Sequence, residues 1–208
     1  MEPPVTATLS AKGTRLNRRG LETRDTVLEV AVRCLAEGGP ESVSANLVAR
    51  RAGVTWGTVQ HQFGDVDGLW AAVLEHVSRR GASLMPVSEH GGLRDRVHEI
   101  VSLMWNAYEK PAVKAIVNLR VALPRERAVL ESEFPRTAAA LVDWDAKWEA
   151  AVRQAFSGFD MDPVKLQRVR SMLPGAVRGL YSEQYLSSYA DMEDAREGLA
   201  DAITAYLS

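Results

Sequence analysis

Apolar side chains recur along most of the chain at the three- and four-residue spacing that places them on one face of an α-helix. The first such segment runs from Thr23 to Glu37, and "EGGP" ends it. We find no alternation of period two that would predict a strand, and no internal repeat. The pattern therefore predicts an all-α fold. The apolar face of the first helix consists of Leu28, Ala31, Val32 and Leu35.

Two short helices are expected next. Ser42 is the predicted N-cap of a helix that ends near Arg51. Gly53 is expected to end that helix, because glycine adopts a left-handed backbone conformation at almost no cost. Thr55 can accept hydrogen bonds from the free amides of a third helix that ends near Phe63.

The remaining segments are also helical. A fourth helix starts near Val66, and "PVSEHGG", residues 86–92, is the expected linker to a second region. A clear helical stripe follows at residues 97–108. We therefore predict a flexible N-terminal arm, a first helical domain, a connecting helix and a second helical domain. Their predicted boundaries are 1–21, 22–66, 67–85 and 92–208.

Prolines mark the ends of several later helices. Asp162 is the expected cap, and Pro163 the first residue, of the longest late helix. Pro174 and Gly175 are expected to kink or split that helix, because proline removes a backbone donor and clashes with the preceding turn.

Charge and composition narrow the class of protein. The net charge is −2, but residues through Gln62 carry eight Lys or Arg against six Asp or Glu, and the first 21 residues are the most basic part. A basic arm is typical of phosphate binding and equally of a solvated tail. The single cysteine, Cys34, excludes an intramolecular disulfide. Because no apolar stretch resembles a secretory signal or a membrane span, we expect a cytoplasmic protein without a membrane partner.

The stretch from Ala52 to Phe63 joins two short helices by a tight turn, which is typical of a helix-turn-helix whose second helix enters the major groove of DNA. Gly57 allows the backbone to come close to DNA, and Gln60 can pair with adenine. The candidate DNA-binding residues are the outward side chains of this helix, two serines before the preceding helix and three arginines near the first helix. They are Arg18, Arg19, Arg24, Ser42, Ser44, Thr55, Trp56, Gly57, Thr58, Gln60 and His61.

On its own, this stretch also fits an ordinary helical corner. A longer pattern is more specific: "S-V-x-x-x-L-V-A-x-R-A-G-V-T-x-G-T" begins at Ser42, a phenylalanine closes the second helix, and a leucine follows six residues later. From Thr23 to about Val77 the chain resembles the DNA-binding domain of the TetR family of transcriptional regulators. Members usually carry a tyrosine at the position of Gln60 and a lysine at that of Val66, both commonly phosphate contacts. In this chain Gln60 can still hydrogen-bond, and the three arginines can supply compensating charge.

The resemblance implies a homodimer that binds a palindromic double-stranded DNA operator, usually represses, and is released by a small-molecule effector. One short helix contacts too few bases to specify a genomic site, so pairing of half-sites is also a physical expectation. Dimerisation in the family typically uses the last two helices. The same apolar faces can instead pack inside one subunit. The candidate interface residues are Leu173, Val177, Leu180, Tyr181, Leu199, Ile203 and Tyr206.

Aromatic residues of the later helices suit an apolar or flat effector, although they also suit a core. Arg120 falls on a stripe set by Val113, Ile116, Val117 and Val121, and a charge facing inward needs a partner. That partner is either a carboxylate, Asp145 or Glu149, or an anionic effector. The candidate effector-binding residues are Met104, Trp105, Tyr108, Arg120, Trp144 and Trp148.

The sequence offers no catalytic or cofactor motif. The histidines His76, His90 and His98 lack the spacing of metal ligands, and no nucleophile elbow, P-loop or dinucleotide fingerprint occurs. Cys34 lies on the apolar face of the first helix, as expected for a buried thiol. We therefore predict a regulator without metal, cofactor or enzymatic activity. The alternative is an all-α ligand carrier or enzyme with a fortuitous helix-turn-helix.

Overall fold

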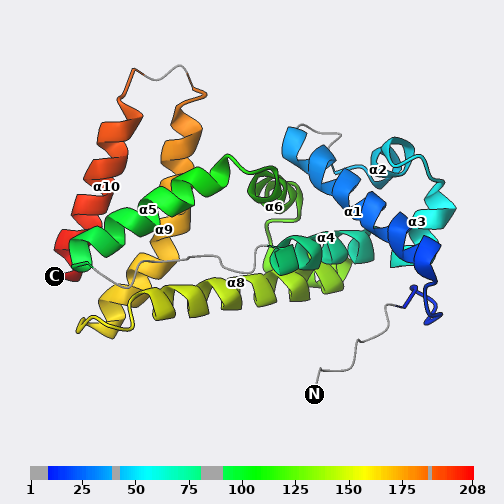
Figure 1. Ribbon diagram of the computed structural model, residues 1–208, viewed down its shortest axis with the longest axis horizontal. Coiled ribbons are helices and arrows are strands. Elements are labelled where there is room, and N and C mark those ends of the chain that lie inside the picture. The colour runs from blue at the N-terminus through cyan, green and yellow to red at the C-terminus, as the bar shows by residue number, and fades with distance from the viewer. Residues whose placement is uncertain (1–8, 39–42, 81–90, 187–188) are drawn as a thin grey trace. The chain divides into compact units, whose positions relative to one another are not determined.

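The computed structural model describes residues 9–38, 43–80, 91–186 and 189–208. These residues form ten α-helices and no β-strand, so the predicted all-α fold is confirmed. No helix in the described part of the chain is both long and apolar enough to cross a membrane. The helices (Figure 1) are α1 (Arg18–Glu37), α2 (Ala45–Arg51), α3 (Trp56–Phe63), α4 (Val66–Arg80), α5 (Leu93–Tyr108), α6 (Pro111–Ala122), α7 (Arg127–Glu133), α8 (Pro135–Ala155), α9 (Pro163–Glu183) and α10 (Met192–Leu207).

The chain divides into two compact units. The first contains Met1–Ala82 and Pro111–Trp144, and the second contains Ser83–Lys110 and Asp145–Ser208. This division differs from the boundary predicted at residues 86–92, most of which lie outside the described residues. The reason is that α6 packs along α1, where Asn118 Nδ2 donates to the carbonyl oxygen of Leu35 at 2.7 Å.

The buried face of α6 agrees only in part with the predicted stripe, of which Ile116 is buried and Val113 and Val117 are half-buried. Ala115, Ile116 and Leu119 face the core of the first unit, whereas Val121 is 69% exposed. The valines suggested a stripe, but the small side chain of Ala115 allows α1 to approach a neighbouring face instead. Arg120 is half-buried on α6.

The helix α1 begins at Arg18 rather than at Thr23, because the Asn17 side chain caps it by accepting a hydrogen bond from the amide of Gly20 at 2.9 Å. The last residues of the predicted flexible arm are therefore helical. Similarly, α2 is capped by Ser44 rather than by Ser42, which lies outside the described residues. The Ser44 hydroxyl accepts from the amide of Leu47 at 3.3 Å.

The second unit contains α5, α9, α10 and the later part of α8. Asp162 caps α9 and Pro163 opens it, as predicted. However, α9 continues through Pro174 as one helix, so the predicted split is wrong. Pro174 leaves the carbonyl oxygen of Arg170 without its helical donor, and Trp148 of α8 donates to that oxygen instead.

Candidate nucleic-acid interface

The helices α2 and α3 meet at a tight turn. Gly53 adopts a φ of 67°, a left-handed conformation that favours glycine, and the amide of Val54 donates to the carbonyl oxygen of Ala49 at 3.0 Å. Val48 and Val59 are fully buried between the two helices and the rest of the first unit. The local sequence therefore produces the predicted helix-turn-helix.

The N-terminus of α3 is capped as predicted. Thr55 Oγ1 accepts a hydrogen bond from the amide of Thr58 at 3.2 Å and lies 3.0 Å from the Thr58 hydroxyl. This cap satisfies one of the free amides at the start of the helix.

One face of α3 is exposed to solvent. Thr55, Gly57, Gln60 and His61 are exposed, and Thr58 is half-buried. Trp56, which the sequence suggested as an outward side chain, is instead half-buried and packs against the core of the first unit. The available surface of α3 is therefore polar, with hydrogen-bonding groups and little apolar area.

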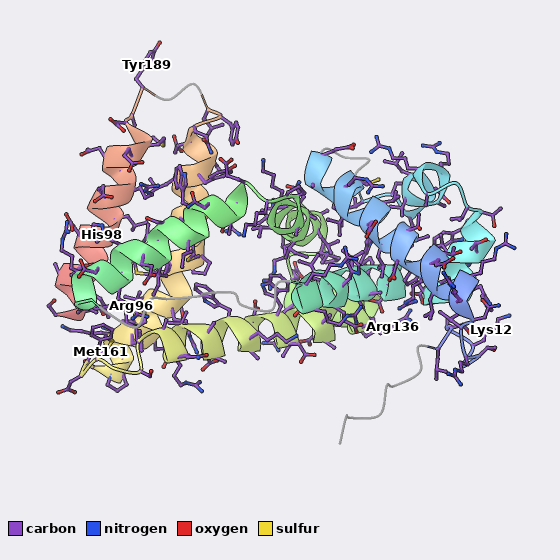
Figure 2. All side chains as sticks on the ribbon, in the orientation of Figure 1. Lys12, Arg96, His98, Arg136, Met161 and Tyr189 are labelled. Carbon is purple, nitrogen blue, oxygen red and sulfur yellow. The ribbon has the colours of Figure 1, made fainter. Side chains whose placement is uncertain are left out.

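A short basic turn lies beside the end of α3. The amide of Ala11 donates to the carbonyl oxygen of His61 at 3.1 Å, and the amide of Ser10 donates to Thr14 at 2.8 Å. Figure 2 shows Lys12 on this segment. The first of these hydrogen bonds anchors part of the predicted flexible arm to α3, and the second closes the turn itself. The exposed basic residues of this region are Lys12, Arg15, Arg18 and Arg19.

Arg24 has an internal role. Its Nη1 donates to the carbonyl oxygen of Gln62 at 2.8 Å, and its guanidinium lies 4.3 Å from the centre of the Phe63 ring. Burial lowers the pKa of the Arg24 guanidinium below its ordinary value. Arg24 therefore supports the end of α3 from inside, whereas Arg18 and Arg19 are exposed.

Gln62 was missed by the sequence analysis. It is buried on the inner face of α3, and its Nε2 donates to the carbonyl oxygen of Gly20 at 3.1 Å. This hydrogen bond ties the recognition helix to the first turn of α1. A polar residue that follows the exposed polar residues Gln60 and His61 gives no sign in the sequence that it points inward.

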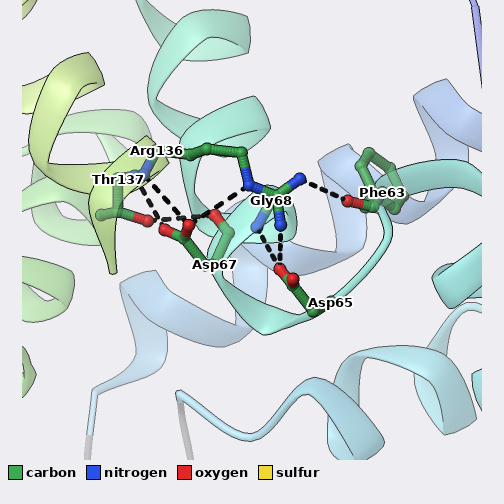
Figure 3. Close-up of polar contacts among 6 residues, drawn as sticks. All are labelled: Phe63, Asp65, Asp67, Gly68, Arg136 and Thr137. Atoms are coloured by element: carbon green, nitrogen blue, oxygen red, sulfur yellow. Dashed lines mark hydrogen bonds and ion pairs between the residues drawn. The ribbon is translucent and has the colours of Figure 1, made fainter. Parts of the chain in front are cut away.

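Arg136 was also missed. It lies in the first turn of α8 and contacts the corner between α3 and α4 (Figure 3). Its Nη1 donates to the carbonyl oxygen of Phe63 at 3.2 Å, its Nε donates to Asp67 Oδ2 at 3.2 Å, and it forms an ion pair with Asp65. No sequence pattern indicates this contact, because about seventy residues separate the partners.

Asp67 in turn caps α8. Its carboxylate accepts from the amides of Arg136 at 3.0 Å and Thr137 at 2.8 Å. Burial raises the pKa of the Asp67 carboxyl, but these donors lower it by more, so that the net pKa lies below its ordinary value. The carboxylate is therefore held charged at the N-terminus of α8.

The predicted effector residues are divided between the two units. Arg120 and Trp144 belong to the first unit, where Trp144 packs against the core. In the second unit, the rings of Trp105 and Tyr108 each lie 5.4 Å from that of Tyr181, while Met104 is half-buried. The structure thus brings together Trp105 and Tyr108.

Tyr181 completes this aromatic cluster from α9. Burial, followed by the hydrogen bond with Tyr185, raises the pKa of Tyr181 to about 12. Its hydroxyl therefore stays neutral near pH 7. Arg196 of α10 lies 6.0 Å from the Trp105 ring, which adds a cation to the edge of the cluster.

The proposed dimer residues lie mainly inside the second unit. Leu173, Val177, Tyr181 and Ile203 are buried there, so for these four the sequence prediction of a free interface does not hold. Leu180 and Leu199 are half-buried, and Tyr206 is 38% exposed. Besides Tyr206, the exposed faces of α9 and α10 carry residues that were not predicted, namely Val164, Arg168, Met172, Gly175, Gly179, Gly198 and Ala202.

The remaining candidates have structural roles. Cys34 and His76 are buried in the first unit, as expected for Cys34. His98 of α5 lies between two carboxylates of α10 (Figure 2): its Nε2 is 2.8 Å from Asp201 Oδ1 and its Nδ1 is 3.2 Å from Glu197 Oε2. The His98 hydrogen bond lowers the pKa of Asp201. Within the described residues, no three His, Cys, Asp or Glu side chains group as metal ligands do.

Known proteins resemble this chain in the sequence of its helix-turn-helix region and in its fold. Residues 27–73 match the sequence profile described as bacterial regulatory proteins of the tetR family. No curated protein matches the chain. One similar solved structure is a transcriptional regulator from Rhodococcus sp. Rha1, which is 18% identical with a TM-score of 0.66 over 88% of this chain and 97% of that chain.

Two further solved structures have the same fold. TylP, a TetR regulator from Streptomyces fradiae, is 22% identical with a TM-score of 0.61 over 92% of this chain and 89% of that chain. The multidrug binding protein EbrR, in complex with imidazole, is 20% identical with a TM-score of 0.59 over 96% of this chain and 98% of that chain. At these identities the likeness establishes the fold, over nearly the whole length of the chain.

Proposed function

We propose that the protein is a cytoplasmic transcriptional repressor of the TetR family, because residues 27–73 match the sequence profile of the tetR family of bacterial regulatory proteins. As a homodimer it binds a palindromic operator, and a small-molecule effector releases it. The observation that carries the proposal is the exposed polar face of α3, a short capped helix at the corner of a helix-turn-helix.

Gln60 and His61 are the side chains assigned to base contacts. Both are exposed in the later part of α3, where Gln60 can form two hydrogen bonds to adenine and His61 can donate or accept at a base edge. Gly57 has no side chain on the exposed face and lets the helix approach the groove. Thr55 and Thr58 are assigned to the nearby phosphates.

The basic turn and the start of α1 are assigned to the DNA backbone. Lys12, Arg15, Arg18 and Arg19 are exposed, and the hydrogen bond from Ala11 to His61 holds the turn beside α3. These charges compensate for the absence of lysine at Val66. Because phosphate contacts release counterions, binding should weaken steeply with added salt.

The exposed faces of α9 and α10 are assigned to the dimer interface. Arg168 Nη1 donates to the Tyr206 hydroxyl at 3.1 Å, so the two helices present one joint surface. A Cβ atom on Gly175, Gly179 or Gly198 would meet nothing within 4 Å, so helices of a second copy can approach closely there. Met172 and Val164 supply exposed apolar area on the same face.

The aromatic cluster of Trp105, Tyr108 and Tyr181 in the second unit is assigned to the effector site. Flat aromatic walls with a polar hydroxyl suit an apolar or aromatic compound. The complex of EbrR with imidazole supports a small ligand in a protein of this fold.

The test is selection of DNA fragments by the purified full-length protein from the genome that encodes it. Recovered fragments should share an inverted repeat, and a gel-shift titration of one such duplex should show an affinity that falls steeply with salt. Recovery of no fragment above background would favour the alternative, an all-α ligand carrier or enzyme. When fragments are recovered, the genes beside them in the genome indicate the class of effector.

A further inference from the structure

The guanidinium of Arg136 holds both sides of the corner that follows the recognition helix (Figure 3). Its bond to the Phe63 carbonyl oxygen satisfies one of the free carbonyls at the end of α3. Its ion pair is with Asp65, which caps α4 by accepting from the amide of Gly68 at 2.8 Å. One side chain of α8 therefore fixes the end of α3 relative to the start of α4.

The helix α4 also stabilises α8, because Asp67 of α4 caps the N-terminus of α8. The Asp67 carboxylate accepts from the amides of Arg136 and Thr137, and the Thr137 hydroxyl donates to the backbone carbonyl of Asp67 at 3.0 Å. Thr137 is 0% exposed. Charge-assisted bonds in such a buried position are stronger and more directional than those on a surface.

The corner between α3 and α4 is tightly packed around Gly68. A Cβ atom on Gly68 would lie 2.0 Å from the Phe63 carbonyl oxygen and 2.5 Å from Arg136 Nη1. Only glycine at this position lets the guanidinium reach the end of α3. A side chain at this position would displace either the Phe63 carbonyl or the guanidinium, so the contact depends on glycine.

The helix α8 is shared by both units. Its residues up to Trp144 belong to the first unit, and those from Asp145 to Ala155 belong to the second. Because an α-helix transmits rotation and translation along its length, a change in the second unit that displaces α8 acts on the Arg136 contact.

We infer that Arg136 is a positioning residue that couples the second unit to the recognition helix. The intact contact with Phe63, Asp65 and Asp67 holds α3 in its DNA-binding position, and an effector that displaces α8 breaks this contact and releases DNA. The inference rests on the proposed function, and it adds the route by which the two units communicate.

The test uses reciprocity, which requires that DNA binding at α3 also stabilises the contact with α8. With full-length protein and a duplex selected as above, amide hydrogen exchange of Arg136 and Thr137 should slow when DNA binds. Arg136→Met, which keeps the aliphatic stem, should weaken DNA binding by about tenfold or more and abolish this slowing. Arg136→Lys, which keeps a charge but lacks the fork, should recover only part of the affinity.

Arg153→Met is the matched control. Arg153 lies on the same helix and forms an exposed ion pair with Glu149 at 3.0 Å, so its loss should leave DNA affinity and exchange unchanged. If Arg136→Met does not fold, Thr137→Val replaces it, since it removes only the hydroxyl donor and keeps the side-chain shape. Either variant should lose affinity at a temperature where circular dichroism shows it to be fully folded.

Wild-type affinity in folded Arg136→Met, or equal slowing of α8 exchange in that variant, would overturn the inference and leave the proposed function standing. Failure of the wild-type protein to bind any duplex would instead overturn the proposed function, and the inference with it. DNA-dependent slowing that is present in the wild type and the control but absent in Arg136→Met would support both.

Discussion

Trp148 Nε1 donates a hydrogen bond to the carbonyl oxygen of Arg170 at 3.3 Å. This carbonyl lies four residues before Pro174, which has no N–H to donate to it. The later part of α8 thus supplies to α9 the donor that the α9 sequence lacks. A helix that local sequence would break is kept continuous by a residue of a neighbouring helix.

We expect Trp148→Phe to destabilise the protein by about 1 kcal/mol beyond the loss of packing, because it leaves a carbonyl unsatisfied. In a Pro174→Ala background the backbone N–H returns, and the penalty should shrink. Urea unfolding of the wild type, both single variants and the double variant forms a complete cycle. Equal penalties in the two backgrounds would show that the hydrogen bond contributes nothing.

Thr55→Ala should destabilise the first turn of α3 by about 1 kcal/mol, since it removes the acceptor for the Thr58 amide. Thr55→Ser keeps the hydroxyl and should retain most of the stability. Amide exchange at Thr58 is the direct measurement. Unchanged protection of that amide in Thr55→Ala would mean that the cap is dispensable.

Gln60→Ala should weaken operator binding by about 1–3 kcal/mol per half-site, the value of a good bidentate base contact. His61→Ala should also weaken it. Gln154→Ala changes an exposed glutamine at the end of α8 and provides the matched control. The measurement is a gel-shift titration at fixed salt, in which wild-type affinity for both α3 variants would exclude this helix as the element that contacts bases.

Local signals in the sequence predicted the features of α3 that depend on neighbouring residues. The Thr55 cap and the Gly53 turn each follow from side chains a few positions apart. Arg136 could not be found in this way, because its partners are about seventy residues away in the sequence. Such contacts depend on how the helices pack.

The errors in helix faces have a related cause. Counting valines placed Val121 inward, but the helix turns the smaller Ala115 toward α1, and the valine is left exposed. In α9 the sequence assigned Leu173 and Val177 to the dimer interface, whereas both are buried inside the second unit. Periodicity alone does not distinguish burial within a chain from burial between copies. Only the packed structure separates the two.

Acid should weaken the corner at Asp67. The pKa of this carboxyl in the folded protein lies below its ordinary value of 3.8, so its contribution to stability is complete above the pKa of the unfolded chain and is lost as pH falls through the folded pKa. Asp67→Asn removes the titrating group, so the free energy of unfolding of this variant should fall less as the pH decreases.

Urea midpoints of the wild type and Asp67→Asn, measured from about pH 2 to pH 7, test this expectation. Asp143→Asn, at an exposed position of α8, is the control and should follow the wild type. At neutral pH, Asp67→Asn should be less stable by about 1–3 kcal/mol, because the amides of Arg136 and Thr137 lose their charged acceptor. Parallel curves for wild type and Asp67→Asn would contradict the assignment.

Ala202→Arg on α10 should separate the proposed dimer. Ala202 is exposed beside Gly198 and Tyr206, and a long charged side chain there would prevent close approach of a second copy. Val142→Arg, at a position of α8 in the first unit that is 57% exposed, is the matched control and should leave the assembly intact. Analytical ultracentrifugation should find a folded monomer for Ala202→Arg and a dimer for the wild type and the control.

Since a monomer contacts a single half-site, Ala202→Arg should also lose tight operator binding even though α3 is unchanged. A dimer that persists in Ala202→Arg would place the interface on another face.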